Sequence, residues 1–174
     1  MKSFAELEFW RGMSSKYSAD APFVKEPRGN RRPKDSPENF HWAADKWFFQ
    51  RFGIMYRSQG VFVTSRKLTA QAYAASPAHT MRIVPISAYR YCWSPNVSDL
   101  LFKAKEMADA REEAIYQFLI DAGYQDHSLE DAHTSGHEVM IHCERFVAIP
   151  AGLLPNADPT CGAGQSAILL PFAN

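Results

Sequence analysis

Apolar residues recur at helical spacing in two long segments of the chain. The first segment spans 36–53, and it opens with Ser36 and Pro37, which favour a helix start, and closes at Gly53, which favours a helix end. One side of this segment carries the apolar residues Phe40, Ala44, Trp47 and Phe48. The second segment, about 98–122, predicts the longest helix, and the alanine-rich residues 67–75 predict a shorter one between them.

Short runs of β-branched and aromatic residues predict the strands, which fall at 60–65, 81–86, 89–93, 138–143 and 145–149. The last two are so close that they form a tight hairpin or one bent strand. The order is therefore helix, strand, helix, strands, long helix, strands. This order favours an α+β domain, with a split mixed or antiparallel sheet and flanking helices, over a regular alternation of strand and helix.

The apolar residues at the two ends of the chain follow neither helical nor strand spacing. Residues 1–35 mix short apolar islands with serine, proline and charge, which predicts an irregular arm leading into an extended segment. The tail after 150 carries glycine, proline and asparagine before an apolar patch at 167–171. A length of 174 residues suits one hydrophobic core. We expect a single domain over 1–174, with a core of about 25–150, an N-terminal arm at 1–24 and a C-terminal tail at 151–174.

Composition and charge narrow the classes of function. The chain has 19 Lys and Arg against 19 Asp and Glu, and this balance argues against a general polyanion binder, although residues 28–34 form a local basic run. Its three cysteines, Cys92, Cys143 and Cys161, cannot all pair with one another, which favours a reduced, cytoplasmic setting. The start resembles no signal peptide, and no run approaches the roughly 18 apolar residues of a membrane span, so we expect no membrane partner.

Common catalytic motifs are missing from the sequence. It has no glycine-rich phosphate loop, no Gly-x-Ser-x-Gly elbow and no His-Glu-x-x-His. Histidines 133 and 137 leave a metal-dependent hydrolase as a weak alternative, but their spacing matches no zinc motif and we expect no metal. His142 and Cys143 are adjacent on a strand and point to opposite faces, so we expect a buried structural thiol there and no activated nucleophile.

Three segments together suggest a chemistry. The basic run at 28–34 can hold a diphosphate or a ribose, Thr64 and Ser65 end a strand with two hydroxyls, and Glu138 opens a late strand. Such a set suits cleavage of a charged N-glycosidic bond. Nicotinamide leaves as a neutral molecule and needs no acid, whereas the oxocarbenium ion that develops needs one nearby carboxylate.

In this order the three segments resemble the ADP-ribosyltransferase family of the toxin-like type. That family carries an arginine on its first strand, a Ser-Thr-Ser motif on a later strand and a glutamate on a strand near the end. The resemblance covers about 25–150 and is carried by PRGNRRPKD (27–35), GVFVTSRKLTAQAYA (60–74) and SGHEVMIHCERFVAIP (135–150). It implies that Arg28 binds NAD, with Arg31 and Arg32 as alternative candidates for this role.

The same resemblance assigns the remaining site residues. Thr64 and Ser65 would order the site, and Glu138 would be the catalytic carboxylate. Independently of the resemblance, Tyr73 on the helix after Thr64 and Ser65 offers an aromatic face that could stack on nicotinamide or adenine. The hydroxyl motif is Val-Thr-Ser in place of Ser-Thr-Ser. Gly136 stands where arginine-modifying members have a second glutamate, which argues against arginine as the acceptor.

The resemblance implies an α+β enzyme that takes NAD as its substrate and transfers ADP-ribose to a protein or nucleic-acid acceptor. Simpler roles also fit each segment: a solvated basic loop, hydroxyls that cap the next helix, and an exposed charge at a strand end. The alternative function is a non-catalytic interaction module, which would bind a partner protein through the aromatic arm and the apolar tail.

Overall fold

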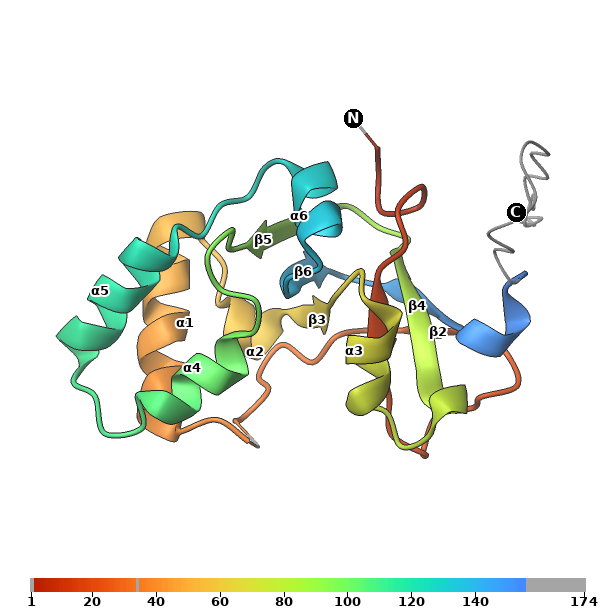
Figure 1. Cartoon of the computed structure of the whole chain (residues 1–174), viewed down its shortest axis with the longest axis horizontal. Helices are drawn as coiled ribbons and strands as arrows, with labels where there is room; N and C mark the ends of the chain where they lie inside the picture. Colours follow the sequence, from red (N-terminus) through yellow and green to blue (C-terminus); the bar gives the residue numbers. More distant parts are fainter. Residues whose placement is uncertain (1, 34, 156–174) are drawn as a thin grey trace.

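Two antiparallel sheets form the centre of the computed structural model, which describes residues 2–33 and 35–155 (Figure 1). Within that range, one sheet has the strand order β1-β4-β7-β2 and the other has the order β3-β6-β5. The first sheet consists of β1 (Trp10–Gly12), β4 (Thr80–Pro85), β7 (Phe146–Pro150) and β2 (Phe23–Lys25). The second consists of β3 (Val61–Val63), β6 (Val139–Cys143) and β5 (Tyr89–Trp93).

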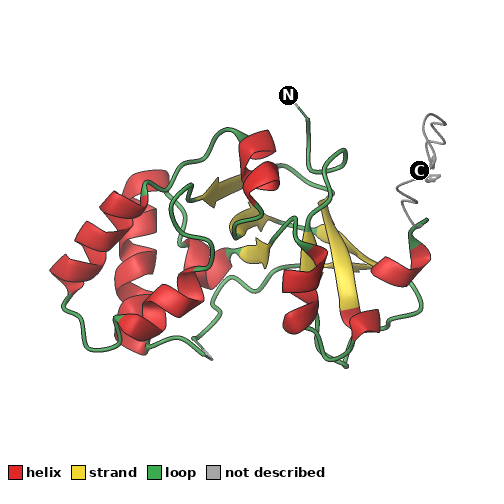
Figure 2. Cartoon of the chain, in the orientation of Figure 1, coloured by secondary structure: helices red, strands yellow, loops and turns green. Residues whose placement is uncertain are grey.

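The helices lie mainly to one side of the sheets (Figure 2). They are α1 (Glu38–Phe52), α2 (Tyr56–Gln59), α3 (Lys67–Ala72), α4 (Leu100–Glu106), α5 (Glu112–Ala122) and α6 (Leu129–Ser135). Short 3-10 turns occur at Pro77–His79 and Ala151–Leu153. Helices α1 and α5 pack against each other, whereas α3 packs on β1 and lies beside β4 (Figure 1).

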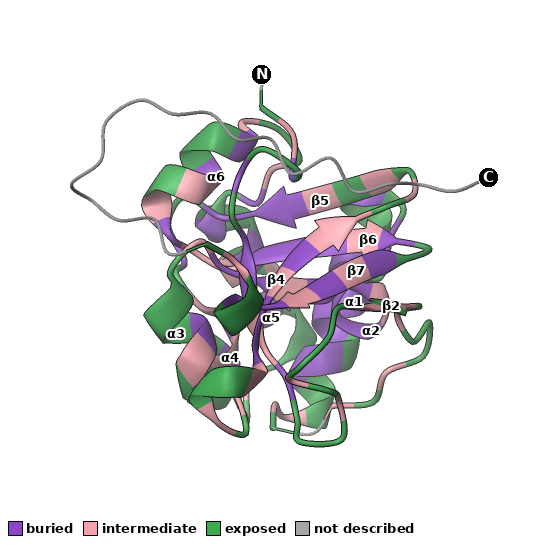
Figure 3. Cartoon of the chain, turned by 90° about the vertical axis from the view of Figure 1, so that its right-hand side faces the viewer, coloured by how far each residue is buried: buried purple, intermediate pink, exposed green. Residues whose placement is uncertain are grey.

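Strand β6 is buried on both of its faces (Figure 3). Met140 belongs to the hydrophobic cluster beneath α1, α4 and α5, while Val139 and Ile141 belong to the cluster between the two sheets. Alternate side chains of a strand point to opposite faces, so one strand serves both clusters. The residues that precede β6 are therefore held at the centre of the molecule.

The two sheets meet at Trp10 and Thr64, which exchange backbone hydrogen bonds. The Trp10 N–H donates to the Thr64 carbonyl at 2.7 Å, and the Thr64 N–H donates to the Trp10 carbonyl at 3.0 Å. One residue further along β1, a side chain links the two sheets: Nη1 of Arg11 donates to the Phe62 carbonyl at 2.9 Å. The sheets separate from this point, which opens space between β1 and β3.

The predicted α+β class is confirmed, but the single helix predicted at 98–122 is wrong. Helix α4 ends at Glu106 and α5 begins at Glu112. Residues 107–111 between them form a turn, and this turn lets both helices direct their apolar sides into one cluster, which includes Leu100, Ala104, Ile115 and Leu119.

The prediction of an irregular N-terminal arm is wrong for residues 4–12, whereas the strand at 23–25 agrees with the extended segment expected after the arm. Residues 10–12 and 23–25 are strands of the first sheet, and Phe4 and Phe9 are fully buried between the sheets. The aromatic residues of this segment contribute enough apolar surface to hold it against the core. The apolar patch at 167–171 and Cys161 lie outside the described residues. No helix in the described ranges has the length and apolar character needed to cross a membrane.

Candidate functional site

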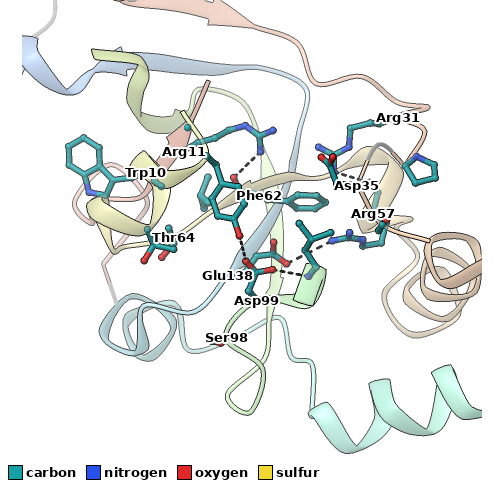
Figure 4. A pocket seen from close by; sticks show the side chains of 18 of the residues that line it. Trp10, Arg11, Arg31, Asp35, Arg57, Phe62, Thr64, Ser98, Asp99 and Glu138 are labelled. Atoms are coloured by element: carbon teal, nitrogen blue, oxygen red, sulfur yellow. Dashed lines mark hydrogen bonds and ion pairs between the residues drawn. The ribbon is translucent and has the colours of Figure 1, made fainter. Parts of the chain in front are cut away.

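A cavity of about 410 Å³ lies where the two sheets separate (Figure 4). Its walls come from β1, the segment before α1, α2, β3, α3, the start of α4 and the turn before β6. The residues with reactive or charged groups include Arg11, Arg31, Arg57, Tyr73, Asp99 and Glu138. Basic and acidic side chains from distant parts of the sequence therefore meet in one place.

Glu138 directly precedes β6, and its backbone is fixed from two directions. Its N–H donates to the Ser98 carbonyl at 2.8 Å. In the β3–β6 register Val63 faces Val139, which places Thr64 opposite Glu138 one step further along. Strand pairing and the loop before α4 thus direct this carboxylate into the cavity.

The hydroxyls of Thr64 and Ser65 hold the turn that carries Glu138. Thr64 Oγ1 donates to the Gly136 carbonyl at 2.8 Å, and Ser65 Oγ donates to the His133 carbonyl. Gly136 has a φ of +72°, a backbone conformation that side chains with a Cβ disfavour. The two hydroxyls therefore act on the backbone between α6 and β6, and their effect on the Glu138 carboxylate is indirect.

Arg57, from α2, is the cation nearest to Glu138. Its Nη1 lies 3.9 Å from Oε1 of Glu138, and the side chains are 5% and 17% exposed. Among the described residues, Nε and Nη1 of Arg57 and Oε1 of Glu138 have no hydrogen-bond partner. Both side chains line the cavity, and Figure 4 marks the ion pair between them.

A buried polar network fixes α2, and with it Arg57. Asp45 Oδ1 accepts from the N–H groups of Arg57 at 2.7 Å and Ser58 at 3.2 Å, and its Oδ2 accepts from the Ser58 hydroxyl. Nε2 of His41 lies 3.1 Å from Oγ of Ser58 and 3.5 Å from Oδ2 of Asp45. Burial lowers the pKa of His41, although the Asp45 carboxylate opposes this effect. The network therefore fixes the backbone of Arg57 at the edge of the cavity.

Three arginines gather around the ring of Phe62. The guanidinium carbons of Arg31 and Arg57 lie 4.1 and 4.7 Å from the ring centroid, and Arg11 bonds to the Phe62 carbonyl. Burial, together with the charges of Arg11 and Arg57, lowers the pKa of Arg31 to about 10. Burial also lowers the pKa of Arg11. A bound anion would relieve this concentration of positive charge.

Acidic groups form the opposite part of the cavity wall. Burial raises the pKa of Glu138, and the Asp99 carboxylate raises it further, while Arg57 opposes both effects. Asp99 accepts from the N–H of Leu101 at 2.8 Å and from the hydroxyl of Tyr73 at 2.7 Å, so it both caps α4 and anchors Tyr73. Burial and this hydrogen bond raise the pKa of Tyr73. The cavity therefore combines cationic and anionic side chains.

The structure brings most of the residues predicted from the sequence into this cavity. Its lining includes Glu138, Thr64, Tyr73, Arg31 and Arg32. Two predicted residues lie elsewhere. Arg28 lines a neighbouring cavity, and Ser65 is turned toward the backbone of α6. Arg28 lies three residues after the end of β2, and Lys25 of that strand and Pro27 line the same neighbouring cavity.

Sequence reasoning missed Arg11, Arg57 and Asp99 as site residues. A signal for Arg11 exists, because it follows the aromatic pair Phe9 and Trp10 in a run that suits a strand. Asp99 is recognisable as a helix cap but not as a cavity residue. Arg57 lies in a four-residue helix without a pattern of its own, so only the fold reveals its position.

The histidines considered as metal ligands have other contacts. The ring of His133 packs edge-on against Phe9 at 5.4 Å, and Nδ1 of His137 lies 2.9 Å from the Ser94 carbonyl oxygen. Across the part of the chain that the structure describes, no group of three or more His, Cys, Asp or Glu side chains could hold a metal ion. The geometry gives the metal-dependent alternative no support.

Comparisons with protein-family models, with curated proteins and with solved structures find no match.

Proposed function

We propose that the protein is an NAD-dependent ADP-ribosyltransferase whose active site is the cavity around Glu138. One observation carries the proposal: Arg11 from the first strand, Thr64 from the end of β3 and Glu138 from the start of β6 converge on one cavity. The family that the sequence resembles carries its arginine, its hydroxyl motif and its glutamate at the same kinds of position: the first strand, a later strand and a strand near the end. The split between the two sheets supports the finer assignment to an ADP-ribosyltransferase-like fold.

In this proposal the arginine that binds NAD is Arg11, in place of Arg28. The resemblance calls for an arginine on the first strand, and β1 carries Arg11. Arg31 and Arg57 flank it around Phe62, so the three guanidinium groups can share the diphosphate. Arg32, which also lines the cavity, is available to the ribose or the outer phosphate oxygens.

The charge distribution of the cavity suits a ligand that carries both signs. NAD has a cationic nicotinamide and an anionic diphosphate, and the cavity offers carboxylates as well as arginines. Glu138 would accept a hydrogen bond from the ribose attached to nicotinamide and stabilise the oxocarbenium-like transition state. Tyr73 is half-exposed beside it and offers a ring on which nicotinamide can stack.

The proposed reaction breaks the bond between nicotinamide and the ribose C1′ atom. The bonding electrons leave with nicotinamide, which departs neutral and unprotonated, and a nucleophile of the acceptor forms the new bond at C1′ and then loses its proton. Without an acceptor, water takes this place and the product is ADP-ribose. Glu138 must be ionised for this role, and Arg57 supplies the nearest positive charge that favours the ionised form.

The acceptor is proposed to be a group other than arginine. Arginine-modifying members of the family carry a second glutamate two residues before the catalytic one, and this chain has Gly136 there. A Cβ at this position would lie 2.2 Å from Nε of Arg66, so the turn has no room for a side chain unless Arg66 moves. A nucleic-acid base or another protein side chain is left as acceptor.

A non-catalytic interaction module is the second candidate. Trp42 and Phe49, seven residues apart on α1, are 45% and 57% exposed and form an apolar stripe that a partner protein could cover. The apolar tail invoked for the same function lies outside the described residues. The two candidates differ in whether the cavity binds NAD.

Calorimetric titration of NAD separates the two candidates. The Glu138→Gln protein serves as the titrated species, since it should bind NAD without cleaving it. We expect saturable heat, and we expect Arg11→Leu added to this background to weaken binding by about tenfold or more, because a charged hydrogen bond contributes roughly 1.5–3 kcal/mol. Arg28→Leu, the matched control, should leave NAD affinity unchanged. Absence of saturable heat would favour the interaction module.

A further inference from the structure

A second cavity, of about 260 Å³, adjoins the first and is lined by basic side chains. These are Arg11, Lys16, Lys25, Arg28 and Arg31. Arg11 and Arg31 line both cavities and stand at their boundary. The remaining three come from segments that the proposed reaction does not use.

The two cavities differ in their charge balance. The first combines the arginines Arg11, Arg31, Arg32 and Arg57 with the acids Asp35, Asp99 and Glu138. Among the described residues, no acidic side chain lines the second. The lining therefore supplies no carboxylate to balance its positive charge, and the pKa values of Arg11 and Arg31, lowered mainly by burial, are consistent with cations held in a partly desolvated space.

The two lysines of the second cavity are held in place by an aromatic ring. Lys25 Nζ donates to the Tyr17 hydroxyl at 2.7 Å, and the ammonium groups of Lys25 and Lys16 lie 4.8 and 5.1 Å from the Tyr17 ring centroid. Tyr17 in turn stacks on Phe23 with 5.2 Å between centroids. Partial burial opposes ionisation of Tyr17, but the hydrogen bond from Lys25 and the two lysine charges outweigh it, so the pKa of Tyr17 is lowered. The ring thus keeps two like charges close together at one edge of the cavity.

We propose that the second cavity is a phosphate subsite, which binds a phosphate group that NAD itself does not carry. Lysine and arginine without acidic neighbours recognise phosphate oxygens through charge-assisted hydrogen bonds. The boundary residues Arg11 and Arg31 place this phosphate beside the diphosphate of the dinucleotide, and in this respect the inference rests on the proposed function. Two sources have the required chemistry: the extra phosphate of a phosphorylated dinucleotide such as NADP, and the backbone of a nucleic-acid acceptor.

The subsite itself is tested with inorganic phosphate and without NAD. Phosphate is titrated at low salt into the wild type, into the double variant Lys16→Gln/Lys25→Gln, and into Lys105→Gln, which removes a charge on α4 that lines neither cavity. We expect the double variant to weaken phosphate binding by about tenfold or more, and Lys105→Gln to leave it unchanged. Equal affinity of the double variant and the wild type, or no binding to the wild type, would overturn the subsite.

The source of the phosphate is tested in the Glu138→Gln background. Tighter binding of NADP than of NAD, with the difference abolished by Lys16→Gln/Lys25→Gln, would assign the phosphate to the dinucleotide. Binding of a single-stranded oligonucleotide to NAD-loaded protein, weakened by the same double variant, would assign it to the acceptor. If neither occurs, the link to the substrate is overturned. Intact phosphate binding by a protein that releases no nicotinamide would overturn the proposed function and leave the subsite standing.

Discussion

The guanidinium of Arg57 lies 3.9 Å from the carboxylate of Glu138, although the two residues are 81 positions apart and come from a short helix and a strand end. Both side chains are largely buried, and the facing atoms have no other partner among the described residues. An ion pair of this kind contributes little to stability, because desolvation offsets its Coulomb attraction. The main effect of the pair is on the ionisation of Glu138, because the charge of Arg57 favours the ionised carboxylate.

Arg57 should control the pH at which the protein becomes active. Burial raises the pKa of Glu138 and Arg57 opposes that effect, so activity should fall on acidification through a pKa above the ordinary glutamate value. Replacing Arg57 with leucine should move this acidic limb to higher pH. Arg57→Lys keeps a positive charge and should return the limb toward that of the wild type. Nicotinamide release measured across pH tests this, and an acidic limb unmoved by Arg57→Leu would refute it.

Glu138 should lower the stability of the protein at neutral pH. Because its pKa is raised by folding, the folded state binds the proton more tightly than the unfolded state, and stability falls as pH rises from the ordinary glutamate pKa through the raised one. Glu138→Gln should therefore unfold at higher urea concentration than the wild type at pH 7, and the difference should shrink in acid. The exposed Glu144→Gln serves as the control and should show no such dependence. A wild type that is the more stable protein at pH 7 would contradict the prediction.

The Thr64 hydroxyl should matter for both stability and activity. Thr64→Val keeps the shape of the side chain but leaves the buried Gly136 carbonyl without its donor, at a cost of about 1–3 kcal/mol. The turn before Glu138 would loosen, so nicotinamide release should also fall. Thr80→Val is the matched control: Oγ1 of Thr80 is buried with no partner in the described part of the chain, so its loss should be neutral or stabilising. Equal effects of both substitutions in chemical unfolding would argue against the role of Thr64.

Gly12 should be essential for the approach of α3 to β1. A Cβ at Gly12 would lie 2.5 Å from the carbonyl oxygen of Ala70 and from the backbone nitrogen of Ala74, neither of which can move without shifting the helix. Gly12→Ala should cost about 1–3 kcal/mol in unfolding experiments, as overpacking does. It should also weaken NAD binding, because Tyr73 follows α3 into the cavity. Gly29→Ala meets no atom within 4 Å and is the control; a loss of NAD affinity there as well would deny Gly12 a special role.

The sequence allowed the α+β class and Glu138 to be predicted because both depend on local patterns. The two strands that follow Glu138 are clear apolar runs, and Asp99 is a recognisable helix cap. The role of Arg11 was missed because the serines and charged residues around it obscured a three-residue strand, which is stabilised by pairing with β4. Arg57 was missed because its position depends on the buried carboxylate of Asp45, a contact between residues that no sequence period connects.

Nicotinamide release from NAD tests the central claim most directly. The rate is measured for the wild type, for Glu138→Gln and for the surface control Glu144→Gln, at equal protein concentration and with an intact fold verified by circular dichroism. The account predicts measurable release by the wild type and by Glu144→Gln, and a loss of about a hundredfold or more in Glu138→Gln, the scale on which removal of a group that stabilises transition-state charge acts. Equal rates for the wild type and Glu138→Gln, or no release by either, would contradict it.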